Sequence, residues 1–214
     1  MGADRRARIV AGLLAAAGWI GLALMLWRQA TAPGWTLAWA LYWNSMFFSD
    51  LGNLATAIVL TGVALRVAPL STPRMLGLAL LSMLLIGGMY HGLSGFRAFT
   101  MFGTLPPGDI LIHSVTPFGT LFFWLLLAPH GGTRWRDLIL WVGFPLLYFG
   151  YALARGAATA DYPYPWMNPD GQGYGPPLAF AGTVAAVFLL LGALVVPLDH
   201  WLGRRRGPSP AAPA

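Results

Sequence analysis

The sequence predicts an all-α integral membrane protein, a bundle of six transmembrane helices with both termini in the cytoplasm. Hydrophobic residues make up 57% of the 214 residues and charged residues only 9%, whereas soluble domains carry about 25% charged residues. Six apolar stretches approach or reach the length that a hydrocarbon core of about 30 Å requires. The basic residues, which are all arginine, are concentrated in alternate connecting segments. The composition and this arrangement point to a membrane protein and away from nucleic-acid binding.

The six predicted spans follow one another with short connections. In chain order they cover residues 9–27, 43–65, 75–90, 110–127, 138–153 and 178–198. Each must be helical, because an unpaired backbone amide or carbonyl is too costly in lipid. We expect residues 1–206 to form a single transmembrane domain and the Pro/Ala-rich tail 207–214 to be disordered.

The first span resembles a signal peptide, because three arginines precede it and Ala30-Thr31-Ala32 looks like a cleavage site. Its apolar run is longer than the roughly 7–15 residues of a signal-peptide core. Arg28 interrupts the run before the cleavage site, and Pro33 follows that site directly. The segment is therefore interpreted as a retained helix.

The second span carries a polar stripe. Ser45, Ser49, Asn53 and Thr56 recur at intervals of four, four and three residues, which places them on one helical face. Asp50 lies beside this stripe. Hydroxyl residues commonly join membrane helices, but an ionisable group inside a span is a functional candidate by default.

The fourth span carries a second stripe, formed by His113, Thr116 and Thr120, with Pro117 four residues after the histidine. By topology, the second and fourth spans both begin at the outer side. We therefore expect Ser49 and His113 to face each other in the outer half of the bundle. A structural alternative is that His113 only forms a hydrogen bond with a neighbouring residue.

Between the fifth and sixth spans lies the longest loop, residues 154–177. It begins near Arg155 and contains Tyr162 and Tyr164, each followed by a proline that fixes the backbone. We expect this loop to fold back over the mouth of the bundle, with a tyrosine near His113. Aromatic residues at this level also serve as simple interfacial anchors.

Orientation follows from the excess of arginine on the cytoplasmic side. Three arginines fall on one side of the predicted topology: Arg28, Arg97 and Arg155. Ten fall on the other: Arg5, Arg6, Arg8, Arg66, Arg74, Arg134, Arg136, Arg204, Arg205 and Arg206. The side with ten is predicted to be cytoplasmic.

A hydroxyl beside a neutral imidazole suggests acyl-transfer chemistry, because histidine can remove the hydroxyl proton and activate a poor nucleophile. The predicted roles are Ser49 as nucleophile and His113 as general base, with Ser45 as the alternative nucleophile. Asp50 or a loop tyrosine would orient the imidazole. Asp50 could instead form a structural ion pair with Arg97 or Arg155.

Several runs resemble the bacterial Pr6Pr family of membrane proteins over nearly the whole chain. They include the segment from Pro145 to Ala157, the loop motif Tyr162-Pro-Tyr-Pro-Trp-Met-Asn168, and Gly173-Tyr-Gly175. The element His113-Ser-Val-Thr-Pro117 is similar to that family's His-x-x-x-Pro element.

Pr6Pr proteins are in turn distantly similar to the androgen-induced/androgen-dependent (AIG/FAR-17a) hydrolases of fatty-acid esters of hydroxy fatty acids. The resemblance implies that His113 is the catalytic histidine and that the nucleophile lies in the run Phe48-Ser49-Asp50-Leu51-Gly52-Asn53. Here serine replaces the family's threonine, glycine precedes the asparagine, and Phe123 stands where an aspartate is expected.

From the pattern of polar residues and the family resemblance together, we expect the protein to hydrolyse a lipid ester without a cofactor. The ester would enter laterally from the outer leaflet of a bacterial cytoplasmic membrane. Asn53 is a possible oxyanion donor. Asp50, Thr116, Arg155, Tyr162 and Tyr164 are expected to support the site or to bind a carboxylate.

Other functions are weighed against this one. A zinc hydrolase needs about three ligands, yet only His91 and His113 are expected near the outer face, so zinc would have to recruit Asp50. Haem would need two facing histidines. A proton-coupled carrier usually needs a charged residue in the inner half of a span, and none is predicted there. A non-enzymatic membrane protein or small-molecule carrier is the remaining alternative, and the oligomeric state is left open.

Overall fold

The computed structural model describes residues 5–95 and 104–205, and these residues form an all-helical bundle. Six of the described helical segments are long and apolar enough to cross a membrane, which confirms the predicted fold class. They are α1 (Arg5–Ala30), α3 (Phe48–Leu65), α4 (Pro73–Leu93), the continuous segment Pro107–Leu126, α8 (Asp137–Thr159) and α9 (Gly175–Arg205). The predicted disordered tail and Arg97 lie outside the described residues.

The second predicted span, 43–65, is wrong at its start. A separate short helix, α2 (Leu37–Asn44), precedes α3, and the chain breaks between them at residues 45–47. Thr36 caps α2, since its hydroxyl accepts a hydrogen bond from the Trp39 amide at 3.2 Å. Phe47 adopts an extended conformation before α3 begins. Ser45 therefore does not continue the polar stripe of Ser49 and Asn53.

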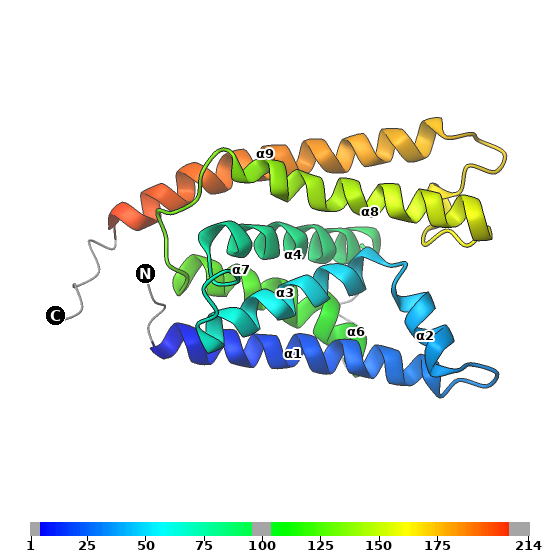
Figure 1. Cartoon of the computed structure of the whole chain (residues 1–214), viewed down its shortest axis with the longest axis horizontal. Helices are drawn as coiled ribbons and strands as arrows, with labels where there is room; N and C mark the ends of the chain where they lie inside the picture. Colours follow the sequence, from blue (N-terminus) through cyan, green and yellow to red (C-terminus); the bar gives the residue numbers. More distant parts are fainter. Residues whose placement is uncertain (1–4, 96–103, 206–214) are drawn as a thin grey trace.

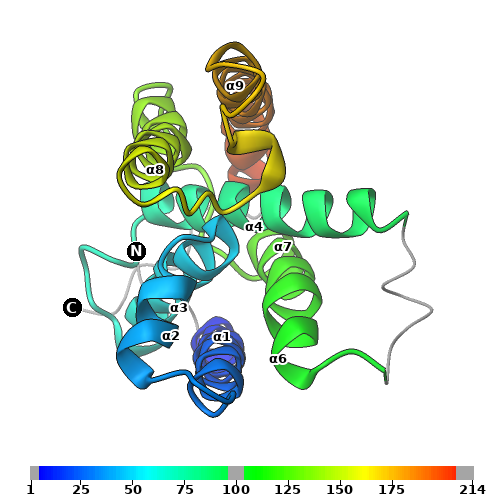
Figure 2. The ribbon, with the colours of Figure 1, turned by 90° about the vertical axis from the view of Figure 1, so that its right-hand side faces the viewer.

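The helices form two groups (Figures 1 and 2). Viewed end-on, α4 crosses between the pair α8 and α9 on one side and α1, α3 and α7 (Thr116–Leu126) on the other. Figure 1 shows that α1 begins and α9 ends at the same end of the bundle, which we call the arginine end. Nine of the described arginines lie there, against two at the opposite end, Arg28 and Arg155. That opposite end carries α2 and is called the α2 end.

Small residues let α1 pack closely on its neighbours. Its buried positions are all alanine or glycine, at intervals of three and four residues: Ala7, Ala11, Ala15, Gly18 and Gly21. A Cβ on Gly18 would lie 3.3 Å from the Cβ of Ala57 on α3. Close backbone approach through small residues is a common way for membrane helices to associate.

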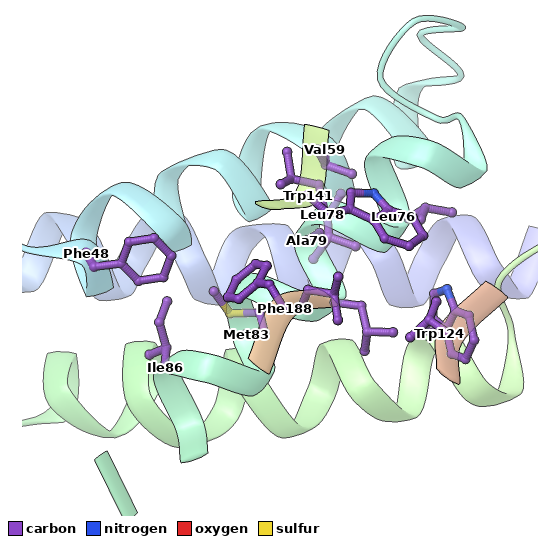
Figure 3. Packing of buried hydrophobic residues seen from close by; sticks show 14 of the residues in the cluster. Phe48, Val59, Leu76, Leu78, Ala79, Met83, Ile86, Trp124, Trp141 and Phe188 are labelled. Atoms are coloured by element: carbon purple, nitrogen blue, oxygen red, sulfur yellow. The ribbon is translucent and has the colours of Figure 1, made fainter. Parts of the chain in front are cut away.

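Larger side chains fill the centre of the bundle (Figure 3). Trp141 of α8 is fully buried against Gly77 of α4, where any side chain would collide with the indole ring, and its Nε1 donates to the Arg74 carbonyl at 2.8 Å. Phe48 and Ile86 lie at one end of this cluster and Trp124 at the other. Buried hydrophobic side chains therefore extend from the middle of the bundle to the arginine end.

A buried polar network closes the arginine end. Asp199 of α9 accepts hydrogen bonds from the amide and hydroxyl of Thr133, at 2.9 and 2.8 Å. Its other oxygen lies 3.0 Å from Nδ1 of His130, and both side chains are almost completely buried. His200 Nε2 lies 2.9 Å from the Thr133 carbonyl. These contacts fasten the loop between α7 and α8 to α9, which extends seven residues beyond its predicted end.

Candidate functional site

A cavity of about 360 Å³ lies at the α2 end, between α3 and α4 on one side and α8 and α9 on the other. Its wall is mostly aromatic and aliphatic. The aromatic members are Trp43, Phe47, Phe48, Tyr90, Tyr148, Phe149, Tyr164, Trp166 and Phe180. Ser49, Asp50 and His113 also line this cavity. Two residues predicted to form the site from separate spans, Ser49 and His113, therefore border one space.

Ser49 and Asp50 occupy the first turn of α3. Phe47 precedes them and provides no side-chain cap, so the first amide groups of the helix have no acceptor within the helix. Asp50 is only 8% exposed. Within ranges 5–95 and 104–205, no hydrogen bond or ion pair to its carboxylate is present. The alternative ion pair of Asp50 with Arg155 is absent here, and Arg97 lies outside the described residues.

His113 lies in a widened π-helical turn, Leu111–Val115, which connects the short helix α6 (Pro107–Ile110) to α7. Pro117 explains part of this geometry, because it has no amide hydrogen to donate to the carbonyl four residues earlier. That carbonyl belongs to His113, and His91 Nε2 of α4 lies 3.2 Å from it. The spacing of His113 and Pro117 thus exposes a backbone acceptor, which α4 then occupies.

An aspartate that the sequence analysis missed stands beside His113. Oδ1 of Asp109 lies 3.5 Å from Nδ1 of His113, one helical turn later, and Oδ2 lies 3.7 Å from Nη1 of Arg28. The ring of Tyr90 stacks on the imidazole, with centroids 4.1 Å apart and planes at 9°. Asp109 therefore has the position that was expected for Asp50 or a loop tyrosine. The four-residue interval between Asp109 and His113 was the available signal.

No hydrogen bond joins the side chains of Ser49 and His113 in the described structure, although both border the cavity. The imidazole is 14% exposed, and its Nδ1 faces Asp109. Nε2 is then the nitrogen left for a partner in the cavity. Catalytic hydrogen bonds are often long or poorly aligned without substrate.

Asn53 has a different position from the one expected of an oxyanion donor. Its amide nitrogen donates to the carbonyls of Ser49 and Ile112, at 2.8 and 2.9 Å. Its amide oxygen accepts from the hydroxyl of Thr116. Both amide hydrogens are consequently used between α3 and the π-helical turn. Asn53 and Thr116 join helices at the floor of the site and do not line the cavity.

Ser45 and Arg155 lie outside the cavity wall. Ser45 ends α2 and donates to the Tyr42 carbonyl at 2.7 Å. Nη1 of Arg155 donates to Ser45 Oγ and to the Tyr151 hydroxyl, both at 3.1 Å, and the guanidinium stacks 3.8 Å from the Tyr42 ring centroid. Arg155 therefore fastens α2 to α8. This arrangement does not support Ser45 as the alternative nucleophile.

The loop between α8 and α9 contributes to the cavity one of the two tyrosines predicted to support the site. Tyr164 stacks on Trp166, with ring centroids 4.8 Å apart, and both line the wall that also contains His113. Burial raises the pKa of the Tyr164 phenol above its ordinary value, and the nearby charge of Asp50 adds to the shift. This phenol therefore stays protonated at neutral pH. Tyr162 packs instead against Gly156, outside the cavity.

The alternatives based on metals find no ligand set here. Over the part of the chain that the structure describes, no three histidine or aspartate side chains lie close enough to hold a metal ion. His91 contacts the His113 carbonyl and the Ser114 hydroxyl, each at 3.2 Å.

No family model matches this chain, and comparisons with curated proteins and with solved structures also found no match.

Proposed function

We propose that this polytopic membrane protein hydrolyses carboxylic esters of lipids, with Ser49 as nucleophile and His113 as general base. One observation carries the proposal: Ser49 and His113, from different helices, border the same largely apolar cavity. Asp109 is assigned the role of orienting the imidazole, because its carboxylate lies beside Nδ1 of His113. A hydroxyl, an imidazole and a carboxylate are the three groups that acyl transfer requires.

In this mechanism the Ser49 oxygen attacks the ester carbonyl while Nε2 of His113 takes the hydroxyl proton. The ester C–O bond then breaks, and His113 returns the proton to the departing alcohol. Water, activated by the same imidazole, cleaves the acyl-enzyme and regenerates Ser49. In this proposal the amides of the first turn of α3, including those of Ser49 and Asp50, stabilise the oxyanion in place of Asn53, because Phe47 provides no side-chain cap for them.

Sidedness and family are part of the proposal. The excess of arginine assigns the arginine end to the cytoplasm, so the cavity would open toward the outer leaflet of a bacterial cytoplasmic membrane and admit lipid laterally. The likeness to Pr6Pr proteins, and through them to the AIG/FAR-17a hydrolases, favours ester hydrolysis without a cofactor.

Fluorophosphonate labelling of the purified protein in micelles tests this function. We expect Ser49→Ala to remove the label and to lower ester hydrolysis by about four orders of magnitude or more, with an unchanged melting temperature. His113→Ala should cause a similar loss, and the double variant should be no worse, since the two residues act as a unit. Ser71→Ala, at the arginine end, is the matched control.

Full hydrolysis by Ser49→Ala would reduce that residue to a helix-packing role. A purified protein that neither labels nor hydrolyses esters would favour the second candidate, a non-enzymatic carrier. The cavity supports that candidate independently, because it could hold an amphiphile without any chemistry.

A further inference from the structure

The charge of the cavity wall narrows the class of ligand. Among its described lining residues, Asp50 is the one carboxylate, and no arginine is present. Arg155 lies on α8, as do the lining residues Tyr148 and Phe149. Its guanidinium is hydrogen-bonded to Ser45 and Tyr151, and Arg155 is not a lining residue. A second carboxylate, Asp109, stands behind His113 but is already paired with Arg28. Among the described lining residues, the acidic group that a ligand would meet is therefore Asp50.

Asp50 is also short of partners. Asp50 as a residue is 8% exposed, and in the described ranges no hydrogen bond to its carboxylate is present. Burial removes hydration from the charged carboxylate, and a partner of opposite charge can compensate for that loss. The position of Asp50 in the first turn of α3 offsets part of this cost, because a helix N-terminus favours negative charge. A cation in the cavity would supply the missing counter-charge.

The remaining wall suits an organic cation better than a metal ion. Aromatic rings from α2, α3, α8 and the loop between α8 and α9 surround the space, among them Trp43, Phe47, Tyr148 and Trp166. Ring faces attract alkylammonium groups, and cages of aromatic side chains are a common way to bind quaternary ammonium. A metal ion would need several oxygen or nitrogen ligands, which the described wall does not bring together.

We propose that the cavity recognises an amphiphile whose head group carries a quaternary or protonated amine, with the Asp50 carboxylate as its counter-ion and aromatic rings around it. This inference rests on the proposed function and names its substrate class: an ester of an amino alcohol with an apolar acyl chain. It differs from the free carboxylate of the substrates that the family resemblance implies. A carboxylate would meet Asp50 without an arginine to balance it.

Binding to the Ser49→Ala protein in maltoside micelles tests the inference without turnover. The matched ligands are decanoylcholine and 3,3-dimethylbutyl decanoate, which differ by replacement of the charged nitrogen with carbon. We expect decanoylcholine to bind at least about tenfold tighter, measured by thermal shift and by tryptophan fluorescence. Adding Asp50→Asn should bring the ratio close to one. Asp170→Asn, an exposed aspartate at the same end, should keep it.

Equal binding of the two esters by the protein that retains Asp50 would overturn the inference, whether or not Asp50→Asn folds. Tighter binding of decanoate than of decanoylcholine would also overturn it. Tetramethylammonium, which has the cationic group without an acyl chain, tests whether the chain contributes to binding. If it binds as tightly as decanoylcholine, the ligand is a small amine and the amphiphile assignment is wrong. These outcomes are readable even if the hydrolysis test fails, because Ser49→Ala does not turn over.

Discussion

At the arginine end, the carboxylate of Asp199 accepts two hydrogen bonds from Thr133 and contacts His130, and the surrounding core is packed. At the α2 end, Asp50, His113 and Ser49 border a cavity, and Asp50 accepts no bond within the described ranges. Both ends thus hold an aspartate, a histidine and a hydroxyl. The fully bonded carboxylate of Asp199 at the first end indicates a structural role, whereas the unbonded carboxylate of Asp50 beside a cavity at the second indicates a role for a ligand.

The largest effect concerns the side of the membrane on which each end lies. We expect fusions after Arg74 and Arg136 to place the reporter in the cytoplasm and a fusion near Gly171 to place it outside, because the side with ten arginines is predicted to be cytoplasmic. Each site is fused to a fluorescent protein, which reports the cytoplasm, and to alkaline phosphatase, which reports the outside. Swapped results would move the cavity to the inner leaflet.

The next largest difference is expected in how much Asp199 and Asp50 contribute to the stability of the fold. Asp199→Ala should lower the free energy of unfolding in micelles by about 3–5 kcal/mol, because it leaves the buried donors of His130 and Thr133 without an acceptor. The matched change, Asp50→Ala, should cost less than about 1 kcal/mol, because no described donor loses its partner. Chemical denaturation of both variants gives the comparison. Equal losses would make the α2 end as structural as the arginine end.

A smaller effect is expected at Asn53, which joins α3 to the π-helical turn. Asn53→Ala should lower the free energy of unfolding by about 1–3 kcal/mol, because two carbonyls and the Thr116 hydroxyl lose their partner. Hydrolysis measured on the folded fraction should change little. A loss of about a hundredfold in turnover at unchanged stability would instead restore Asn53 as an oxyanion donor.

The six-helix fold was predictable because lipid imposes the length and apolar character of each span. The break at residues 45–47 was not, since this stretch is as aromatic and apolar as the helix that follows. The extent of α9 was also missed, because Asp199 and Arg204 end the apolar run while the helix continues. Asp199 consequently falls just beyond the predicted span 178–198, although it is buried within the bundle.

Within the site, the sequence placed Ser49 and His113 at the same end of the bundle through the polarity of two spans. It did not reveal Asp109, because that residue lies just outside the predicted fourth span and only the helical start at Pro107 brings it one turn from His113. The aromatic wall of the cavity could not be predicted from the sequence either. It is assembled from α2, α3, α4, α8, α9 and the loop between α8 and α9, whose relative positions depend on tertiary packing.

The π-helical turn that holds His113 contains one residue more than an α-helical turn would. Deletion of a single residue there, such as Leu111, would restore regular winding while the two flanking halves stayed nearly in register, because one wide turn of five residues and one α-helical turn of about four sweep almost the same angle. The change would be confined to the turn itself, so the direction of the His113 side chain relative to the cavity would shift while Thr116 and Thr120 stayed in the core. The position of His113 at the cavity wall therefore depends on the length of the chain between Pro107 and Pro117 as well as on its chemistry.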